Sequence, residues 1–213
     1  MKVRDVMTWN VVTVASDTHI MEARKIMDVH DFRRLPVVDK GKLVGMVTKE
    51  RIGRAGPSQA TSLSVWEINY LLAKMTIREV MVKDVVTVSP DTSVEAAIAI
   101  AQSKKAGALP VMEGNNLIGI VTTNDFFYRI LNPLLGIGMA GTRLVVSECG
   151  EAKRLQEVIE FVGKHGAKIL SVHSMPAIEG GEADLCLHLE ATDISRLIKD
   201  LADKGYSTEI VER

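Results

Sequence analysis

The sequence predicts an α+β protein in which two βαββα modules form a pseudo-two-fold pair, followed by a ferredoxin-like βαββαβ domain. Two observations support this. An ungapped repeat relates residues 3–52 to residues 77–126, and the hydrophobic periodicity changes after a glycine-containing stretch. We therefore divide the chain into module 1 (1–60), a linker helix (61–76), module 2 (77–131), a linker (132–141) and a C-terminal domain (142–213).

The repeat is the main signal in the chain. The two copies are related by a constant offset of 74 residues, and 18 of the 50 aligned pairs are identical. The matches recur in the same order in both copies: Val11–Val14 with Val85–Val88, Asp17–Thr18 with Asp91–Thr92, Leu35–Val37 with Leu109–Val111, and Gly45, Val47 and Thr48 with Gly119, Val121 and Thr122. An order kept twice over this length indicates a duplicated module.

Each copy has the pattern strand, helix, strand, strand, helix. The β-branched segment Val11–Val14 predicts the first strand. The helix follows from apolar residues at helical spacing, and in the second copy Thr92 and Glu95 predict a capping box at its start. Leu35–Val38 and Leu43–Val47 predict a hairpin. A module of this size buries too little apolar surface alone, so we expect the copies to pack on each other.

The segment after residue 141 predicts a separate unit. Strands are expected at 144–146, 169–173, 185–189 and 208–211, with a helix after the first strand and another after the third. Gly136, Gly138 and Gly141 mark the linker before it. These three glycines precede a strand instead of joining a strand to a helix, so they do not predict a dinucleotide-binding loop. The resulting order βαββαβ predicts a ferredoxin-like fold.

Composition excludes several classes of function. The chain has 26 Lys and Arg residues against 27 Asp and Glu residues. This balanced charge does not predict nucleic acid as a partner, because nucleic-acid binding requires a clustered basic surface. No apolar run approaches the roughly 20 residues that span a bilayer, and the N-terminus lacks the apolar segment of a signal peptide. Two cysteines do not make a disulfide framework. We therefore expect a cytoplasmic protein without a membrane partner.

The end of the second copy carries groups that suit a nucleotide. The Asp125 carboxylate can accept hydrogen bonds from two ribose hydroxyls. Thr122, at the start of a predicted helix, can offer a hydroxyl and helix N–H groups to phosphate. The structural alternative is that Thr122 caps the helix and Asp125 adds favourable charge to its first turn. The residues alone leave both interpretations open.

The duplicated pattern resembles the CBS module. The resemblance rests on Val6-Met7 and Val80-Met81, on the Leu-Pro-Val strand, and on the closing Gly-x-Val-Thr, and it covers residues 1–131. The segment 61–74 resembles the inter-repeat linker of the acetoin-utilisation accessory family. Members of that family carry two CBS modules and then an ACT-like domain. The order of elements after residue 141 resembles that ACT domain.

The resemblance implies an adenosine-nucleotide site, such as one for AMP, ADP, ATP, S-adenosylmethionine or NAD(H). The ending Gly119-x-x-Thr122-x-x-Asp125 would hold ribose and phosphate. The residues implied to flank adenine are Met81, Asp84, Val85, Val86, Gly107, Ala108 and Leu109. Arg33 and Arg34 either face phosphate or are solvated surface charges. The first copy has Arg51 in place of Asp125, and arginine cannot accept the ribose hydroxyls.

Other candidates are weaker. The five histidines show no metal-ligand spacing. His173, Cys186 and His188 fall on one face of the predicted C-terminal sheet, where we expect a protein interface rather than a metal site. No His or Asp near Cys149 completes a nucleophile set. The turn 148–151 lies where ACT domains hold an amino acid, but its acidic residue and glycine are spaced differently. Trp66 and Tyr70 are expected as core or interface anchors.

These observations predict a non-catalytic regulatory protein that senses an adenosine nucleotide and regulates an unidentified partner protein. No acid–base pair, nucleophile or metal set predicts an enzyme, and no catalytic cofactor is expected. The alternative is an amino-acid or small-molecule sensor that uses the ACT-like domain, with the CBS pair as a dimerisation scaffold. We also expect a homodimer, with the outer face of the C-terminal sheet as one contact: Val145, Ser171, His173, Cys186 and His188.

Overall fold

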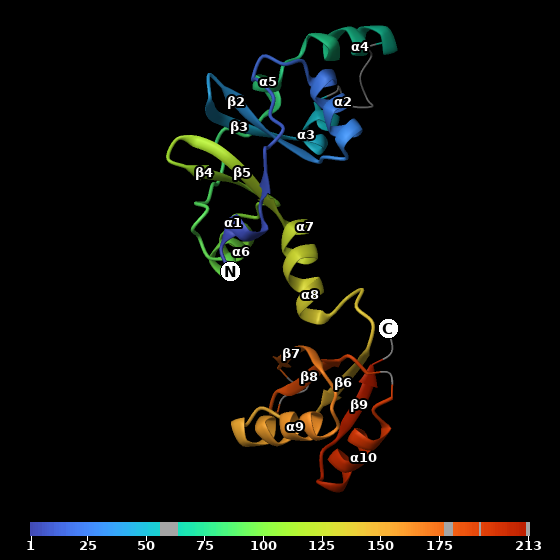
Figure 1. Cartoon of the computed structure of the whole chain (residues 1–213). Helices are drawn as coiled ribbons and strands as arrows, with labels where there is room; N and C mark the ends of the chain where they lie inside the picture. Colours follow the sequence, from blue (N-terminus) through green and yellow to red (C-terminus); the bar gives the residue numbers. More distant parts are fainter. Residues whose placement is uncertain (56–63, 177–180, 192, 212–213) are drawn as a thin grey trace. The chain divides into compact units, whose positions relative to one another are not determined.

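The computed structural model describes residues 1–55, 64–176, 181–191 and 193–211. The chain divides into two compact units, Met1–Phe126 and Phe127–Arg213 (Figure 1). The boundary precedes the linker that we expected at 132–141. Residues 56–63, which end predicted module 1 and begin the predicted linker helix, lie outside the described part.

The first unit contains both copies of the repeat. The first copy forms α1 (Val3–Val6), β1 (Thr8–Trp9), α2 (Ile20–His30), β2 (Arg34–Asp39), β3 (Lys42–Thr48) and α3 (Lys49–Arg54). Helix α4 (Val65–Lys74) follows, capped by a reciprocal pair of hydrogen bonds between Ser64 and Glu67. The second copy forms α5 (Ile77–Val80), α6 (Val94–Ser103), β4 (Ala108–Glu113), β5 (Asn116–Thr122) and α7 (Thr123–Phe126). The β2–β3 and β4–β5 hairpins have the same register and the same bulge.

The two copies exchange their opening segments. Strand β1 of the first copy pairs with β5 of the second, with Thr8 opposite Ile120. At the equivalent place, Val82 of the second copy bridges Met46 in β3 of the first. The offset of 74 relates the two pairs (8 to 82, 46 to 120), so the exchange is reciprocal. Each hairpin is therefore extended by the other copy, which explains how two small modules complete one fold.

Backbone hydrogen bonds also join the first helix of each copy to the segment before the second helix of the other copy. The Val3 N–H donates to the Thr92 carbonyl over 2.9 Å, and the Ile77 N–H donates to the Thr18 carbonyl over 2.9 Å. The Arg78 guanidinium also donates to the buried Ser16 hydroxyl over 2.8 Å. Hydrogen bonds from Ser16 in turn hold the pKa of the Asp39 carboxyl below its usual value.

The core of the first copy confirms the predicted helical spacing. Ile20, Ala23 and Met27 are fully buried on α2, and they pack with Ile77 and Val80 from the second copy. Two local predictions were wrong. The residues at 11–14 do not form a strand, because the exchange places the paired strand at Thr8–Trp9 and only Val14 bridges β2.

The second correction concerns the start of α6. Ser93 is the N-cap, and its hydroxyl accepts the Ala96 N–H over 3.1 Å. Thr92 instead accepts the Ser89 N–H in the preceding turn. The helix therefore begins one residue later than the Thr92–Glu95 pattern predicted.

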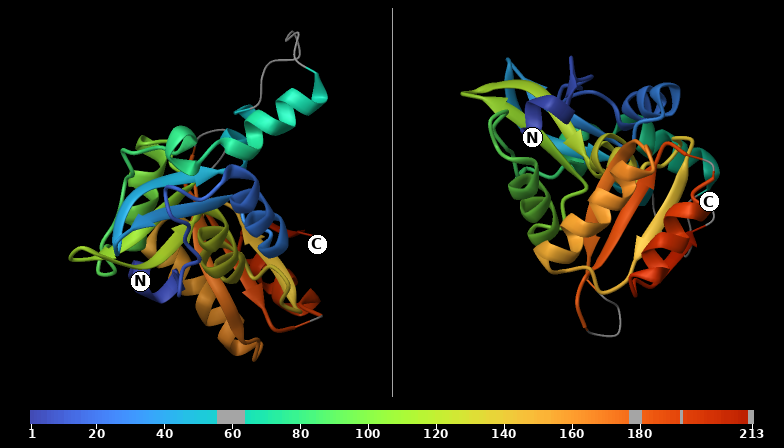
Figure 2. Two further views of the ribbon diagram at one scale, coloured as in Figure 1. Left: turned by 90° about the horizontal axis from the view of Figure 1, so that it is seen from above. Right: turned by 60° about the horizontal axis from the view of Figure 1, so that its bottom comes forward.

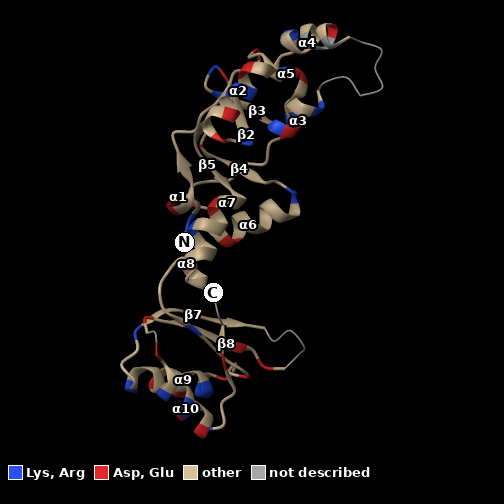
Figure 3. Ribbon diagram, turned by 90° about the vertical axis from the view of Figure 1, so that its right-hand side faces the viewer, with Lys and Arg blue, Asp and Glu red and all other residues tan. Residues whose placement is uncertain are grey.

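The second unit has the predicted element order. It contains β6 (Thr142–Val146), α9 (Ala152–Lys164), β7 (Ile169–Met175), β8 (Asp184–Leu189), α10 (Ser195–Asp203) and β9 (Thr208–Val211). The antiparallel sheet has the order β7-β8-β6-β9, and α9 and α10 lie on one of its faces (Figure 2). Both helices carry charged residues of both signs (Figure 3). The core lies between the helices and the sheet: Leu144, Val146, Val158, Val162, Leu185, Leu187, Leu189, Leu197 and Leu201 are buried there.

The other face of this sheet is partly covered by the same unit. A helical segment made of η1 (Phe127–Leu131) and α8 (Asn132–Leu135) precedes the glycines, and α8 contacts β7. The His188 ring lies against Gly136 and Gly141, where side chains would collide with it. His188 is 2% exposed and Cys186 3% exposed. These two residues therefore do not offer the open surface that we expected for a dimer contact.

Within the described ranges, no helix combines the length and apolar character that crossing a membrane requires.

Candidate functional site

Thr122 and Asp125 are joined by a reciprocal set of hydrogen bonds at the start of α7. The Asp125 Oδ2 accepts from the Thr122 N–H over 2.8 Å and from the Thr122 hydroxyl over 2.7 Å. The Thr122 Oγ1 accepts the Asp125 N–H over 3.3 Å. The capping role that we considered is therefore present. Because the cap fixes the carboxylate at the end of β5, the same contacts orient Asp125 for any ligand that approaches this strand end.

Strand β4 brings three further predicted residues to this end of β5. Ala108 stands opposite Thr122 in the β4–β5 ladder, and the Thr123 N–H donates to the Gly107 carbonyl over 3.4 Å. Ala108 and Leu109 are buried, so they form an apolar wall beside the cap. Thus Gly107–Leu109 and Thr122–Asp125 are brought together.

Arg34 of the first copy extends onto Gly107 of the second. A Cβ at position 107 would collide with the Arg34 guanidinium, so glycine leaves the space that the arginine occupies. In the repeat alignment Gly107 is equivalent to Arg33. The absence of a side chain at Gly107 therefore allows the Arg34 guanidinium of the first copy to lie beside the start of β4 in the second copy. Arg34 is half-buried, whereas Arg33 is exposed.

The other predicted adenine-flanking residues lie at a different hairpin. A Cβ on Gly45 would be 2.6 Å from the Met81 sulfur, and Val82 bridges Met46, so this segment runs along β3 of the first copy. The Arg51 guanidinium donates to the Val80 carbonyl there over 3.1 Å. The structure therefore groups Met81 with Arg51, not with Asp125, and residues 84–86 lie between Val82, which bridges β3, and Val88, which bridges Val111 in β4. Asp84 is exposed, and Val85 and Val86 are half-buried.

The equivalent segment beside β5 comes from the first copy. Met7 lies against Gly119, Thr8 stands opposite Ile120, and Trp9 stands opposite Gly119. Sequence reasoning missed this segment because it assigned each opening strand to its own copy. Nothing within a single copy signals the exchange, since the pattern of residues is the same whichever hairpin the strand joins.

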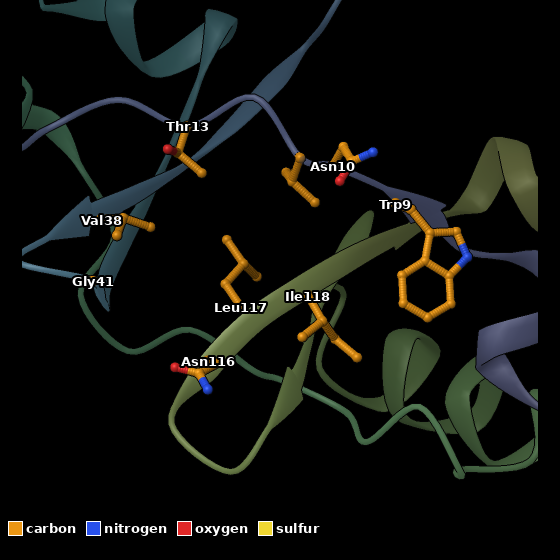
Figure 4. Close-up of a pocket in the computed structure, with 9 residues that line it drawn as sticks. Trp9, Asn10, Thr13, Val38, Gly41, Asn116, Leu117 and Ile118 are labelled. Carbon is orange, nitrogen blue, oxygen red and sulfur yellow. The ribbon is translucent and has the colours of Figure 1, made fainter.

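A pocket of about 550 Å³ is lined in part by this crossing segment (Figure 4). Its lining includes Trp9, Asn10 and Thr13 from the first copy and Asn116–Ile118 at the start of β5. Trp9 is 55% exposed, and no charged side chain lines the pocket. An aromatic ring, two amides and an apolar wall suit a neutral planar group better than a phosphate. At the equivalent positions of the second copy, Trp9 and Asn10 are replaced by Lys83 and Asp84.

Metal ligands and Cys149 were the other candidates for chemistry in the sequence. No group of three or more His, Cys, Asp or Glu side chains in the described part of the chain is placed to hold a metal ion. Burial raises the pKa of the Cys149 thiol, opposite to the shift that activates a nucleophilic cysteine. In the turn 148–151, the Glu148 N–H donates to Asp184 and the Cys149 N–H donates to the Ala183 carbonyl. Both amides are thus engaged within the unit.

The exchanged pair of βαββα copies defines a tandem two-module protein, and sequence comparison identifies the module. The profile described as "CBS domain" matches residues 3–56 and 77–132. The chain belongs to the CBS domain family. The match confirms the duplication that the repeat predicted and the CBS module that its motifs resemble.

Three relatives illustrate the range of the family. Inosine-5'-monophosphate dehydrogenase of Methanocaldococcus jannaschii is 28% identical over 216 residues, which cover 99% of this chain but 40% of that protein. A structure described as an acetoin utilization protein (AcuB) from Vibrio cholerae is 30% identical, with a TM-score of 0.53 over 62% of this chain and 91% of that one. The CBS domain pair of protein MJ0100, in complex with 5-methylthioadenosine and S-adenosyl-L-methionine, is 30% identical, with a TM-score of 0.51 over 62% of this chain and 96% of that one.

Proposed function

We propose that this protein is a regulatory sensor that binds an adenosine-containing ligand in the CBS pair and transmits that state to the C-terminal unit or to a partner protein. The observation that carries the proposal is the fixed Thr122–Asp125 pair, which lies beside Gly107–Leu109 at the end of β5. The similar MJ0100 pair, in complex with two adenosine compounds, supports the class of ligand.

The exchange changes which residues would complete the site. Asp125 would accept the ribose hydroxyls, and the segment that follows Met7 in the first copy would flank adenine, because β1 runs along β5. Arg34, lying on Gly107, would face the phosphate, with the exposed Arg33 beside it in the chain. The proposal thus joins both copies around one ligand.

A second site is expected at the end of β3. Met81, Asp84, Val85 and Val86 would flank a base there, but Arg51 stands where the ribose acceptor is needed. Since a guanidinium only donates hydrogen bonds, this site would bind ribose poorly. We therefore expect one tight adenosine site in each chain.

We also propose that the C-terminal unit is an ACT-like domain with a ferredoxin-like fold. Its element order βαββαβ and its strand order β7-β8-β6-β9 support this assignment. The engaged amides of Glu148 and Cys149 do not favour an amino-acid site at the turn 148–151. We therefore propose that this unit responds to nucleotide binding in the CBS pair, to which the helical segment after Asp125 connects it.

Calorimetric titration tests the ligand class. AMP, ATP, S-adenosylmethionine and NADH would be titrated into the full chain, with guanosine monophosphate as the matched control for base identity. Binding of at least one adenosine compound with a stoichiometry near one per chain, and much weaker binding of the guanosine control, is the expected result. Absence of heat with all four adenosine compounds would contradict the proposal.

A further inference from the structure

Besides His188, three polar side chains gather on the outer face of the C-terminal sheet. Arg143 on β6 and Ser171 on β7 both stand opposite His188 of β8, the strand that lies between β6 and β7. His173 stands two residues further along β7, opposite Cys186. Since alternate residues of a strand share a face, all three side chains project away from the core that α9 and α10 cover.

Each of these side chains has a polar atom that is buried without a partner. Arg143 Nε, Ser171 Oγ and His173 Nδ1 are shielded from solvent and have no hydrogen-bond partner among the described residues. The ion pairs found in that part of the chain do not include Arg143. Buried polar groups in folded proteins are normally paired, and a partly buried guanidinium is normally paired with an anion.

The contacts of Arg143 fix which of these atoms donate. Its Nη2 lies 3.5 Å from His173 Nε2. A guanidinium can only donate, so Nε2 must accept, and the proton of the neutral ring is then on Nδ1. Burial lowers the pKa of His173, and the positive charge of Arg143 lowers it further, so both effects favour the neutral ring. Arg143 Nε–H and His173 Nδ1–H are therefore both donors, and the Ser171 hydroxyl can be a third.

We propose that Arg143, Ser171 and His173 form a binding site for a small oxyanion, a carboxylate or a phosphate, on the outer face of the C-terminal sheet. One cation and three donors match an acceptor-rich ligand with a single negative charge. Each of the three residues is partly exposed as a whole, so the cluster lies at the surface, and a ligand would reach the shielded donor atoms by displacing the side chains that cover them. This site lies in the second unit and does not depend on the proposed adenosine site.

Nuclear magnetic resonance of the full chain tests the site directly. Arginine Nε–H and histidine ring signals would be followed while inorganic phosphate, and separately acetate, is added at constant ionic strength. The expected result is a saturable shift of the Arg143 and His173 signals with at least one anion. Saturation by phosphate alone, by acetate alone or by both identifies the ligand class. No saturation at these signals with either anion overturns the proposal.

Two variants and one control make the assignment specific. Arg143→Met keeps the alkyl stem and removes every donor, so binding is expected to weaken at least tenfold. Ser171→Ala is a smaller change at a hydroxyl without a partner among the described residues, so it is expected to fold like the parent protein and to weaken binding several-fold. Arg196→Met, on the exposed side of α10, is the matched control and is expected to bind like the parent protein. Parent-like affinity in the Ser171→Ala and Arg143→Met proteins would overturn the site.

Discussion

The Met7 side chain of the first module lies directly against Gly119 of the second, so close that a Cβ on this glycine would be 2.6 Å from the Met7 sulfur. Met81 and Gly45 form the equivalent pair with the roles of the modules reversed. These two contacts explain why the closing Gly-x-Val-Thr motif begins with glycine in both copies. The glycine is required where the opening segment of the other module crosses the hairpin.

The first prediction uses these glycines. Gly119→Ala and Gly45→Ala should each destabilise the protein by about 1–3 kcal/mol, as overpacking does. Gly45→Ala should cost more, because the added Cβ also lies 2.8 Å from the Val82 carbonyl oxygen, which cannot rotate away. Gly53→Ala is the matched control, since nothing lies within 4 Å of its Cβ position on α3, and it should stabilise by about 0.5–1 kcal/mol. Urea denaturation measures all three.

The repeat supplies the control for the second prediction, because Asp125 and Arg51 occupy equivalent positions. Asp125→Ala should weaken adenosine-nucleotide binding about a hundredfold or more, since two hydrogen bonds to a charged group contribute roughly 1.5–3 kcal/mol each. Arg51→Ala should leave ribose recognition unchanged. Calorimetry compares the two.

The cap at Thr122 requires a folding control for this experiment. Asp125→Ala removes the Oδ2 that accepts from Thr122, which should cost about 0.5–2 kcal/mol of stability. Asp125→Asn keeps one acceptor for the cap while removing the charge, so it should fold like the parent protein and still bind weakly. Parent-like nucleotide affinity in Asp125→Ala would show that the site is elsewhere.

A third prediction concerns the contact between Gly136 and His188. Both Gly136 and Gly138 have positive φ angles, of 65° and 79°, so alanine is strained at either position. Only at Gly136 would the new Cβ also collide with the His188 ring. Gly136→Ala should therefore lower the stability of the C-terminal unit by about 1–3 kcal/mol more than Gly138→Ala does. Hydrogen exchange at β8 measures the difference, and equal effects would show that the ring contact is unimportant.

His173 predicts a pH dependence of stability. Its pKa in the folded protein is below the ordinary value, so its contribution to stability is fully present above about pH 6.5 and is lost as the pH falls through the lowered pKa. The unfolded chain takes up a proton in this window that the folded protein resists. His173→Gln should flatten that part of the stability profile. Thermal melts between about pH 5 and 8 compare the two proteins, and identical slopes would contradict the prediction.

The fifth prediction concerns assembly. We propose a homodimer through α4, because Trp66 is 86% exposed and Tyr70 is 60% exposed on this helix, which rules out the core role that we had allowed them. Light scattering should give twice the chain mass at micromolar concentration. Trp66→Lys should shift the protein toward the monomer, whereas Lys104→Met, at the C-cap of α6, should not. A monomeric parent protein would contradict this prediction.

The sequence alone determined which modules the chain contains. The repeat is visible as identical residues at one constant offset. The spacing of Ile20, Ala23 and Met27 reflects burial on one face of a helix, and that of Leu185, Leu187 and Leu189 reflects burial on one face of a strand. Such patterns are local, because the geometry of a helix or a strand alone places residues at these spacings on the same face, whichever element packs against that face. The element order of the C-terminal unit was therefore predictable.

The tertiary structure decided which segments meet. Met81 and Gly119 belong to the same repeat, yet the exchange places Met81 at Gly45 and pairs the strand of Gly119 with the segment that follows Met7. Pairing within a copy and pairing between copies bury the same residue types, so the sequence pattern does not distinguish them. The donors of Arg143 and His173 likewise converge only when β6, β8 and β7 are aligned in register. Long-range strand pairing sets these contacts, and no short stretch of sequence encodes it.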